Sequence, residues 1–453
     1  MLPWRLDGGS DPVATMRAAL AATAGREDVV RALASRPGEA DLLRAAEASA
    51  ARRAAGQALS PLDGMPVGIK DIMETADLPT QMGCAIHAGF QAGRDAAAAA
   101  ALRRAGAIVA GKAATTAYAI GPGGPTTNPH DPARSPGGSS SGSAAGVAAG
   151  FFSAALGTQT MGSVIRPASY CGTFGYKPGH GLLSMQGVHP LSPTLDHMGV
   201  LAADLPLCWA VAKLLADGCA TPGIGDPGDH GLPGAAAKPS AARHPARLLF
   251  LRTAGWDEPA MQDAPQAAFA GLLQDLGAAG VEIVDPQAAG GDAAAFEAAL
   301  VAEAPGAMDI LTWEMQWPLA EYARQHGAQL PARIHDLLRR GAALDARTYG
   351  DRLAARAAMQ GRFHDLLAAL GTDAVIMPSA SGPAPRGLAD TGSRTCQMYW
   401  SWLGVPALSL PLLQVGGMPF GVQLVGAAGS DSALFGTAAA LLGLHRAGPQ
   451  GTR

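Results

Sequence analysis

Short apolar segments alternate with helical segments along this chain, and this alternation is the main constraint on its fold. Residues 65–69 predict a short apolar strand that ends at Lys70 and Asp71. Residues 96–105 predict a helix that runs into a second strand at residues 107–110. Strands that alternate with helices are typical of proteins in which helices cover a sheet, so we expect an α/β fold.

The remaining segments divide the chain into four parts. Residues 1–60 predict a helical packing layer, and residues 61–220 hold most of the Gly- and Ser-rich motifs. The Pro-, Gly- and Ala-rich residues 221–246 predict an exposed connection. Residues 247–453 are expected to supply further sheet, helices and pocket walls. Strands are predicted there at residues 247–251, 374–377, 407–410 and 421–424, and helices at residues 260–276, 293–303, 305–325, 348–370 and 431–444.

Charge and composition exclude several classes of partner. The formal net charge is -4, and 48% of the residues are hydrophobic while 15% are charged. Such a chain has no overall attraction for nucleic acid or for an anionic membrane, so a small-molecule substrate is expected. The N-terminus lacks the order of a secretory signal, and the longest stretch of small apolar residues, 142–156, is too short to span a bilayer. We therefore expect a cytoplasmic protein.

The cysteines and histidines give no sign of a metal site or a disulfide framework. The five cysteines are widely spaced and contain no CxxC pair. The 11 histidines are dispersed and contain no HExxH motif. We expect neither a metal nor another cofactor.

Residues 137–142 read Gly-Gly-Ser-Ser-Ser-Gly and present three hydroxyl groups in one turn. They satisfy the G-x-S-x-G pattern around Ser140, but a nucleophile elbow follows a buried strand, whereas residues 128–136 contain three prolines and no apolar run. No lysine follows Gly142, so the segment is not a Walker loop either. The residues alone leave open a flexible loop or an active-site turn.

A second loop is predicted at residues 157–162, directly before Ser163. A loop that ends in Gly-Ser can direct consecutive backbone N–H groups at one point beside a hydroxyl, which is the arrangement of an oxyanion hole. The alternative is an ordinary turn between two strands.

A series of segments then matches one known family in order along the chain. They are residues 64–71, 102–107, 111–112, 136–167, 171–178, 404–407 and 421–426. Together they resemble the amidase signature, which characterises a family of cofactor-free Ser-Ser-Lys amide hydrolases. The resemblance implies a single amidase domain over residues 1–453, with a large mixed and twisted β-sheet flanked by helices on both faces.

The resemblance also implies roles for particular residues. By motif position Lys70 is the base, Ser139 the bridging serine with a cis peptide, and Ser163 the nucleophile that forms an acyl-enzyme with a small amide. Substrate-binding residues are expected at Gly138 and Gln159. The oxyanion hole is assigned to the backbone N–H groups of Thr160, Met161, Gly162 and Ser163.

Elementary chemistry supports a lysine base. A serine hydroxyl needs a neighbouring group to take its proton, and neither loop contains a histidine. Lowering the pKa of Lys70 from ~10.4 to ~7.5 corresponds to roughly 4 kcal/mol, which burial can supply. Asp71 would oppose this shift, but successive strand residues point to opposite sides, so we expect Asp71 to face away from the site.

Two positions depart from the family pattern. Met161 stands where members usually have Gly, and Met tolerates a positive φ poorly, so the loop is either strained or not left-handed there. The family's arginine two residues after the nucleophile is replaced by Ile165, and Arg166 follows it. Arg166 is expected either to bind the carboxylate of a small carboxylate-bearing amide or to form a structural ion pair. Other candidates for the pocket walls are Trp313, Met315, Tyr399 and Trp400.

The resemblance leaves two further functions open. One is that of the A subunit of a glutamine amidotransferase, which releases ammonia from glutamine within a multi-subunit complex. The other is an inactive scaffold or binding module, which predicts the loss of Lys70, Ser139 or Ser163, although all three are present. Homodimers are common in the family, so a homodimer is the assembly to test.

Overall fold

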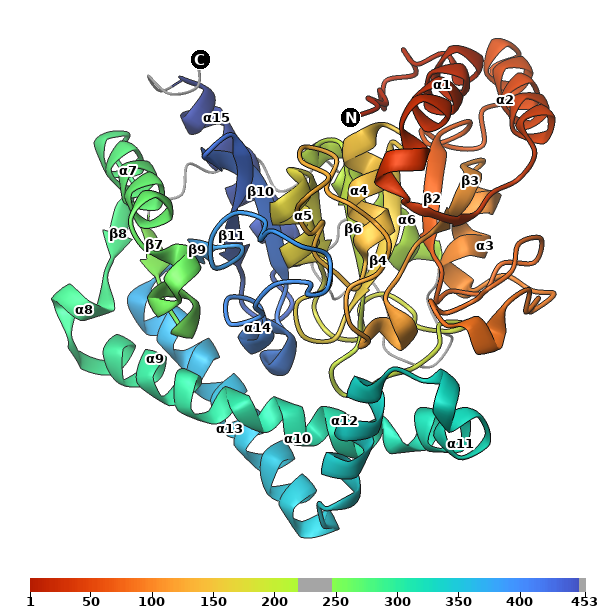
Figure 1. The fold of residues 1–453 in the computed structure, drawn as a ribbon. Coiled ribbons are helices and arrows are strands. Elements are labelled where there is room, and N and C mark those ends of the chain that lie inside the picture. Colours follow the sequence, from red (N-terminus) through yellow and green to blue (C-terminus); the bar gives the residue numbers. More distant parts are fainter. Residues whose placement is uncertain (219–246, 448–453) are drawn as a thin grey trace.

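An 11-stranded β-sheet runs through the computed structural model, which describes residues 1–218 and 247–447 (Figure 1). The connection predicted at residues 221–246 lies outside the described residues. The strand order is β1-β3-β2-β4-β6-β5-β10-β11-β9-β7-β8. The strands are β1 (Leu33–Ser35), β2 (Pro66–Lys70), β3 (Ile108–Ala113), β4 (Ala154–Gln159), β5 (Phe174–Lys177), β6 (His197–Ala202), β7 (Arg247–Phe250), β8 (Glu282–Val284), β9 (Ala374–Pro378), β10 (Ala407–Val415) and β11 (Met418–Val425).

The sheet is mixed, as predicted. Strand β2 pairs in parallel with β3 and β4, whereas β10 pairs in antiparallel with β5 and β11. The pairing of β5 with β10 joins the first and second parts of the chain in one sheet, with Ala407 opposite Lys177. The two parts of the chain thus share one sheet, and the single domain stays a prediction.

Helices cover both faces of this sheet, and the α/β fold class is therefore confirmed (Figure 1). α1 begins as predicted, because the Asp11 side chain accepts hydrogen bonds from Val13 and Ala14 and Pro12 occupies the first helical position. The helices are α1 (Pro12–Val30), α2 (Glu39–Ala54), α3 (Ala97–Arg104), α4 (Ser141–Ala149), α5 (Ile165–Cys171), α6 (Leu205–Gly218), α7 (Ala264–Ala278), α8 (Pro286–Ala289), α9 (Gly291–Glu303), α10 (Ala307–Glu314), α11 (Gln316–His326), α12 (Ala332–Ala342), α13 (Ala346–Leu370), α14 (Met398–Leu403) and α15 (Asp431–Ala447).

Alternating strand residues contribute to different cores on the two faces. In β9, Ala374 and Ile376 belong to a core that includes residues of α3, α6, α7 and α15. The intervening Val375 and Met377 belong to a second core with residues of α9 to α14. This is the two-residue period expected of a strand buried on both faces. A third core lies between the sheet and helices α1, α2 and α4.

Two predicted elements are wrong in their boundaries. Residues 157–162 were expected to form a loop, but β4 continues through Gln159 because it pairs with β6 along its whole length. The single helix expected at residues 305–325 is two helices, α10 and α11, which meet at Met315. Strands β1, β5, β6 and β8 and helices α5, α8, α12 and α14 were not predicted, and β1 interrupts the helical layer expected at residues 1–60.

The sheet brings Lys70 next to the start of the 160–163 loop. Strands β2 and β4 are parallel neighbours, so their carboxyl ends lie at the same edge. Lys70 is the last residue of β2, and Gln159 is the last residue of β4. Among the residues that the structure describes, no helix is both long and apolar enough to cross a membrane.

Candidate active site

Lys70 lies completely buried at the end of β2. Its Nζ is 2.8 Å from Ser139 Oγ and 2.7 Å from Thr158 Oγ1, and both oxygens accept hydrogen bonds from it. Thr158 belongs to the parallel neighbour β4, so sheet pairing fixes its distance from Lys70. The lysine amine is therefore held between two hydroxyl groups.

The electrostatic environment favours the uncharged form of Lys70. Burial lowers its pKa to about 7, while the carboxylate of Asp196 acts in the opposite direction. The adjacent Asp71 forms an ion pair with Lys112 over 3.1 Å instead. This placement of Asp71 agrees with the expectation from strand geometry. Because the pKa of Lys70 is lowered to about 7, a large fraction of its amine is neutral near pH 7.

The turn that carries Ser139 is fixed from two sides. The peptide bond between Gly138 and Ser139 is cis, as the resemblance implied. Arg166 Nη2 donates a hydrogen bond of 2.6 Å to the Gly138 carbonyl, and the Ser140 hydroxyl donates one of 3.2 Å to the Thr158 carbonyl. Helix α4 starts directly after this turn, at Ser141.

The backbone N–H groups of residues 160–163 are available to a ligand. None of the four has a hydrogen-bond partner among the described residues. Gln159 holds the loop in place, because its Oε1 accepts hydrogen bonds from the backbone N–H groups of Val164 and Ile165 at 2.9 and 3.0 Å. Met161 has no positive φ, so the loop is not left-handed at this departure from the family pattern.

A second contact braces the loop from the side. Thr160 Oγ1 donates a 2.6 Å hydrogen bond to Asp196, whose other oxygen accepts from the backbone N–H groups of Leu191 and Ser192. Burial raises the pKa of Asp196 to about 6. Sequence reasoning missed this role, because Asp196 lies outside both Gly- and Ser-rich segments.

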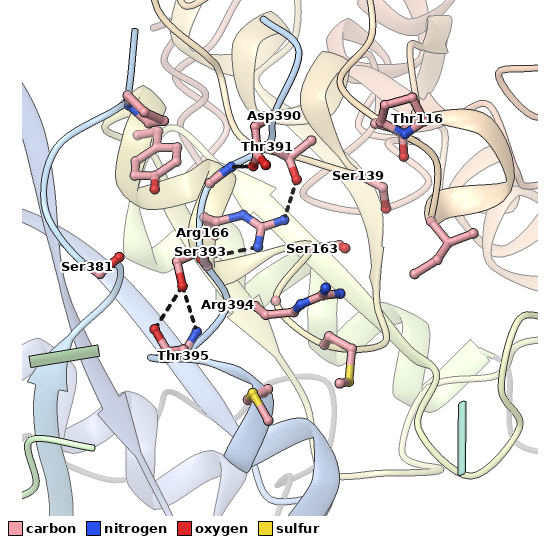
Figure 2. Close-up of a pocket in the computed structure, with 18 of the residues that line it drawn as sticks. Thr116, Ser139, Ser163, Arg166, Ser381, Asp390, Thr391, Ser393, Arg394 and Thr395 are labelled. Atoms are coloured by element: carbon pink, nitrogen blue, oxygen red, sulfur yellow. Dashed lines mark hydrogen bonds between the residues drawn. The ribbon is translucent and has the colours of Figure 1, made fainter. Parts of the chain in front are cut away.

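Ser139, Ser163 and the 160–163 loop line one cavity of about 610 Å³ (Figure 2). Figure 2 shows the two serines facing this cavity from different segments of the chain. Within the described residues a hydrogen bond joins Lys70 to Ser139, whereas none joins Ser139 to Ser163. The cavity gives a small substrate access to both hydroxyl groups.

The residues expected to bind substrate occupy different positions. Arg166 lines the cavity, but Gln159 and Gly138 do not. Gln159 is fully buried and its amide Nε2 donates to Ser401 Oγ over 3.0 Å. The large side chains proposed for the pocket walls also lie elsewhere: Tyr399, Trp400 and Met315 are buried in a hydrophobic core, and Trp313 lines a different cavity.

Sequence reasoning also missed much of the cavity wall. Residues 389–395 lie between β9 and α14 and line the cavity beside α5, and Arg333 and Glu258 come from other parts of the second half. The signal was a polar Asp-Thr-Gly-Ser-Arg-Thr run immediately before an apolar helix. No group of three or more His, Cys, Asp or Glu residues suited to a metal ion occurs within residues 1–218 and 247–447.

The family of this chain is shown by a family model that matches most of its length. The family model described as Amidase matches residues 15–435. The chain belongs to the amidase family. This confirms the resemblance drawn from the sequence motifs.

Individual relatives of this amidase differ in their extent of similarity. The A subunit of the glutamyl-tRNA(Gln) amidotransferase of Chloroflexus aggregans is 38% identical over 178 residues, which cover 38% of this chain and 35% of that protein. The match thus spans about a third of that relative's length. A crystal structure of an amidase is 28% identical over 97% of each chain, with a TM-score of 0.80. The native peptide amidase of Stenotrophomonas maltophilia is 26% identical over 97% of this chain and 95% of that chain, with a TM-score of 0.76.

Proposed function

We propose that the protein hydrolyses the C–N bond of a small amide through an acyl-enzyme on Ser163. The observation that carries the proposal is the buried Lys70 amine, 2.8 Å from Ser139 Oγ, behind a cavity that Ser139 and Ser163 both line. A desolvated lysine with a pKa of about 7 is a base of suitable strength at neutral pH.

In the acylation step Ser163 Oγ attacks the amide carbon and forms a C–O bond. The Ser163 proton passes to Ser139, whose own proton passes to Lys70. The N–H groups of residues 160–163 stabilise the negative charge on the carbonyl oxygen. The C–N bond then breaks, and the proton on Lys70 returns through Ser139 to the departing ammonia or amine.

Water completes the reaction by the same route. It attacks the Ser163 ester, and its proton passes through Ser139 to Lys70 as the new C–O bond forms. The ester bond breaks, and Ser163 Oγ takes the proton back, which releases the carboxylic acid and regenerates the free hydroxyl. No cofactor enters this scheme.

A second candidate function is favoured by the similarity to the A subunit of an amidotransferase. In that case glutamine would be the amide, and a partner chain would receive the ammonia. Purified protein that releases ammonia from glutamine only after a partner is added would support this candidate over an independent amidase. Ser139 and Ser163 line one cavity and Lys70 is hydrogen-bonded to Ser139 behind it, which argues against an inactive scaffold.

The test is ammonia release from a panel of primary amides by the wild type and by Ser163→Ala. We expect the substitution to remove nearly all turnover and to leave the thermal midpoint close to that of the wild type, because Ser163 Oγ makes no hydrogen bond within the described residues. Lys70→Met should also lose turnover. Ser163→Ala with wild-type activity would refute the proposal.

A further inference from the structure

The cavity wall carries more positive than negative side chains. Its lining includes the guanidinium groups of Arg166, Arg333 and Arg394, but only the carboxylates of Glu258 and Asp390. An excess of positive charge in a partly enclosed cavity attracts an anionic ligand. The hydrogen bonds of the three guanidinium groups decide which of them is available to bind one.

Both terminal nitrogens of Arg166 donate hydrogen bonds to the protein itself, whereas its buried Nε has no partner among the described residues. Its Nη2 donates to the Gly138 carbonyl at 2.6 Å and to Thr391 Oγ1 at 3.0 Å, and its Nη1 donates to the Ser393 carbonyl at 3.2 Å. These bonds tie the turn before Ser139 to the 391–393 segment (Figure 2). Arg166 is thus a positioning residue, and its guanidinium geometry is fixed before any substrate arrives.

Both carboxylates also have partners of their own. One oxygen of Glu258, Oε1, accepts hydrogen bonds of 2.5 Å from the hydroxyl groups of Ser393 and Thr395. Asp390 Oδ1 accepts a 2.6 Å bond from the backbone N–H of Gly392. Neither carboxylate forms an ion pair with an arginine of the cavity within the described residues.

Arg394 differs from Arg166, because its guanidinium has no hydrogen bond and no ion pair within residues 1–218 and 247–447. Arg333 has none there either, but it is exposed, whereas Arg394 is partly buried. Burial lowers its pKa to about 10, and the neighbouring charges of Arg166 and Arg333 act in the same direction, while Asp390 opposes them. A guanidinium taken partly out of water without a counter-ion is unfavourable unless a ligand supplies the missing negative charge.

The position of Arg394 relates this charge to the predicted nucleophile. Figure 2 shows the Arg394 side chain extending from the 391–395 segment into the cavity, in the direction of Ser163. Both residues line the same cavity of about 610 Å³. One small molecule can therefore place an amide at Ser163 and a second group at Arg394.

We propose that Arg394 binds the carboxylate of the substrate, so that the preferred substrates are small primary amides that carry a carboxylate, such as monoamides of short dicarboxylic acids. This inference rests on the proposed amidase function. A guanidinium fits a carboxylate with two parallel N–H···O bonds, and it selects against a neutral group because the cation would then stay unpaired. Arg333, which is exposed, adds positive potential at the rim of the cavity.

The experiment compares malonamic, succinamic and glutaramic acids with the corresponding neutral diamides. For each pair, the ratio of kcat/KM for the acid over that for the diamide measures recognition of the carboxylate. The wild type is expected to prefer at least one acid. Arg394→Gln should reduce this ratio on the order of tenfold or more, mainly by raising KM for the acid. Arg394→Lys keeps the positive charge but cannot donate two parallel hydrogen bonds to a carboxylate, so it should give an intermediate ratio.

Arg17→Gln is the matched control, because it removes one positive charge from an exposed position on α1 outside the cavity lining. Its ratio should equal that of the wild type. The assignment of Arg394 would be overturned if Arg394→Gln kept its thermal midpoint and its ratio stayed within about threefold of the wild-type value. The proposed amide hydrolysis would not be affected by that result. Absence of turnover of every amide by the wild type would instead refute the proposed function.

Discussion

At the scale of single residues, the main feature of the site is the dry environment of the Lys70 amine. It is fully buried, and its nearest polar neighbours are two hydroxyl groups rather than a carboxylate. The neighbouring carboxylate of Asp71 is occupied by Lys112. Desolvation without a close counter-charge is what lowers the pKa of the amine.

Substitution of Thr158 tests the role of its hydroxyl group, the second one that contacts the Lys70 amine. The Lys70 amine donates to Thr158 Oγ1 over 2.7 Å, which favours the protonated form. Thr158→Val should therefore move the inflection of the pH profile of kcat/KM to lower pH and should reduce kcat by roughly tenfold, because the amine loses one of its two anchors. Thr158→Ser keeps a hydroxyl and is the control. An inflection at the wild-type pH in Thr158→Val would show that this bond does not tune Lys70.

At the scale of elements, the function depends on how strands β2 and β4 end and how helix α5 begins. The parallel pairing of the two strands places Lys70 beside Thr158. The Gln159 side chain accepts hydrogen bonds from the backbone N–H groups of Val164 and Ile165 at the start of α5. These two bonds hold the end of the 160–163 loop, whose own N–H groups have no backbone partner among the described residues.

Gln159 can be tested by changing only its hydrogen-bonding groups. Gln159→Leu leaves two buried N–H groups without a partner, and we expect a loss of about 1–3 kcal/mol in the free energy of unfolding together with reduced kcat. Gln159→Glu keeps the accepting oxygens at a helix N-terminus and should retain more of both. Chemical denaturation and steady-state kinetics give the two readouts. Equal stability of Gln159→Leu and the wild type would contradict this role.

The sequence predicted the surroundings of Lys70, Ser139 and Ser163 better than the wall of the cavity. Ser139 and Ser163 stand in or directly after Gly-rich segments that predict loops, and Lys70 stands at the end of a predicted apolar strand, so local motifs indicate their surroundings. The cavity wall depends instead on long-range packing that brings the 389–395 segment beside α5. Large aromatic residues such as Trp400 were natural candidates for that wall, but they fill the core because burial of apolar area outweighs display in a pocket.

The whole molecule is held together where its two halves meet in the sheet. Strand β5 of the first half pairs with β10 of the second. Tyr176 of β5 also donates a 2.6 Å hydrogen bond to the buried Asp431 at the start of α15. The active-site cavity is lined from both halves, so these contacts also maintain its shape.

Tyr176→Phe tests whether the halves unfold together. It removes the hydroxyl that bonds Asp431, and we expect a loss of about 1–3 kcal/mol in the free energy of unfolding. If the sheet is one cooperative unit, the fluorescence of Trp209 in the first half and of Trp400 in the second should report the same shift in midpoint. Each signal is measured in a variant that keeps only that one of the chain's seven tryptophans. A shift confined to one tryptophan would indicate separate units.

A control is needed before the pH profile is attributed to Lys70, because burial also raises the pKa of Asp196 to about 6. The Asp196 carboxylate favours the charged form of Lys70. Asp196→Asn should therefore keep the inflection and move it to lower pH. Disappearance of the inflection would identify Asp196 as the titrating group.

The central claim, that an uncharged Lys70 is the base, is tested most directly by the dependence of kcat/KM on pH between 5 and about 10. Because the pKa of Lys70 is lowered to about 7, kcat/KM should rise about tenfold per pH unit below that value and level off above it. A profile that keeps rising to about pH 10, as for a lysine in water, or one that is flat across the range would contradict the account.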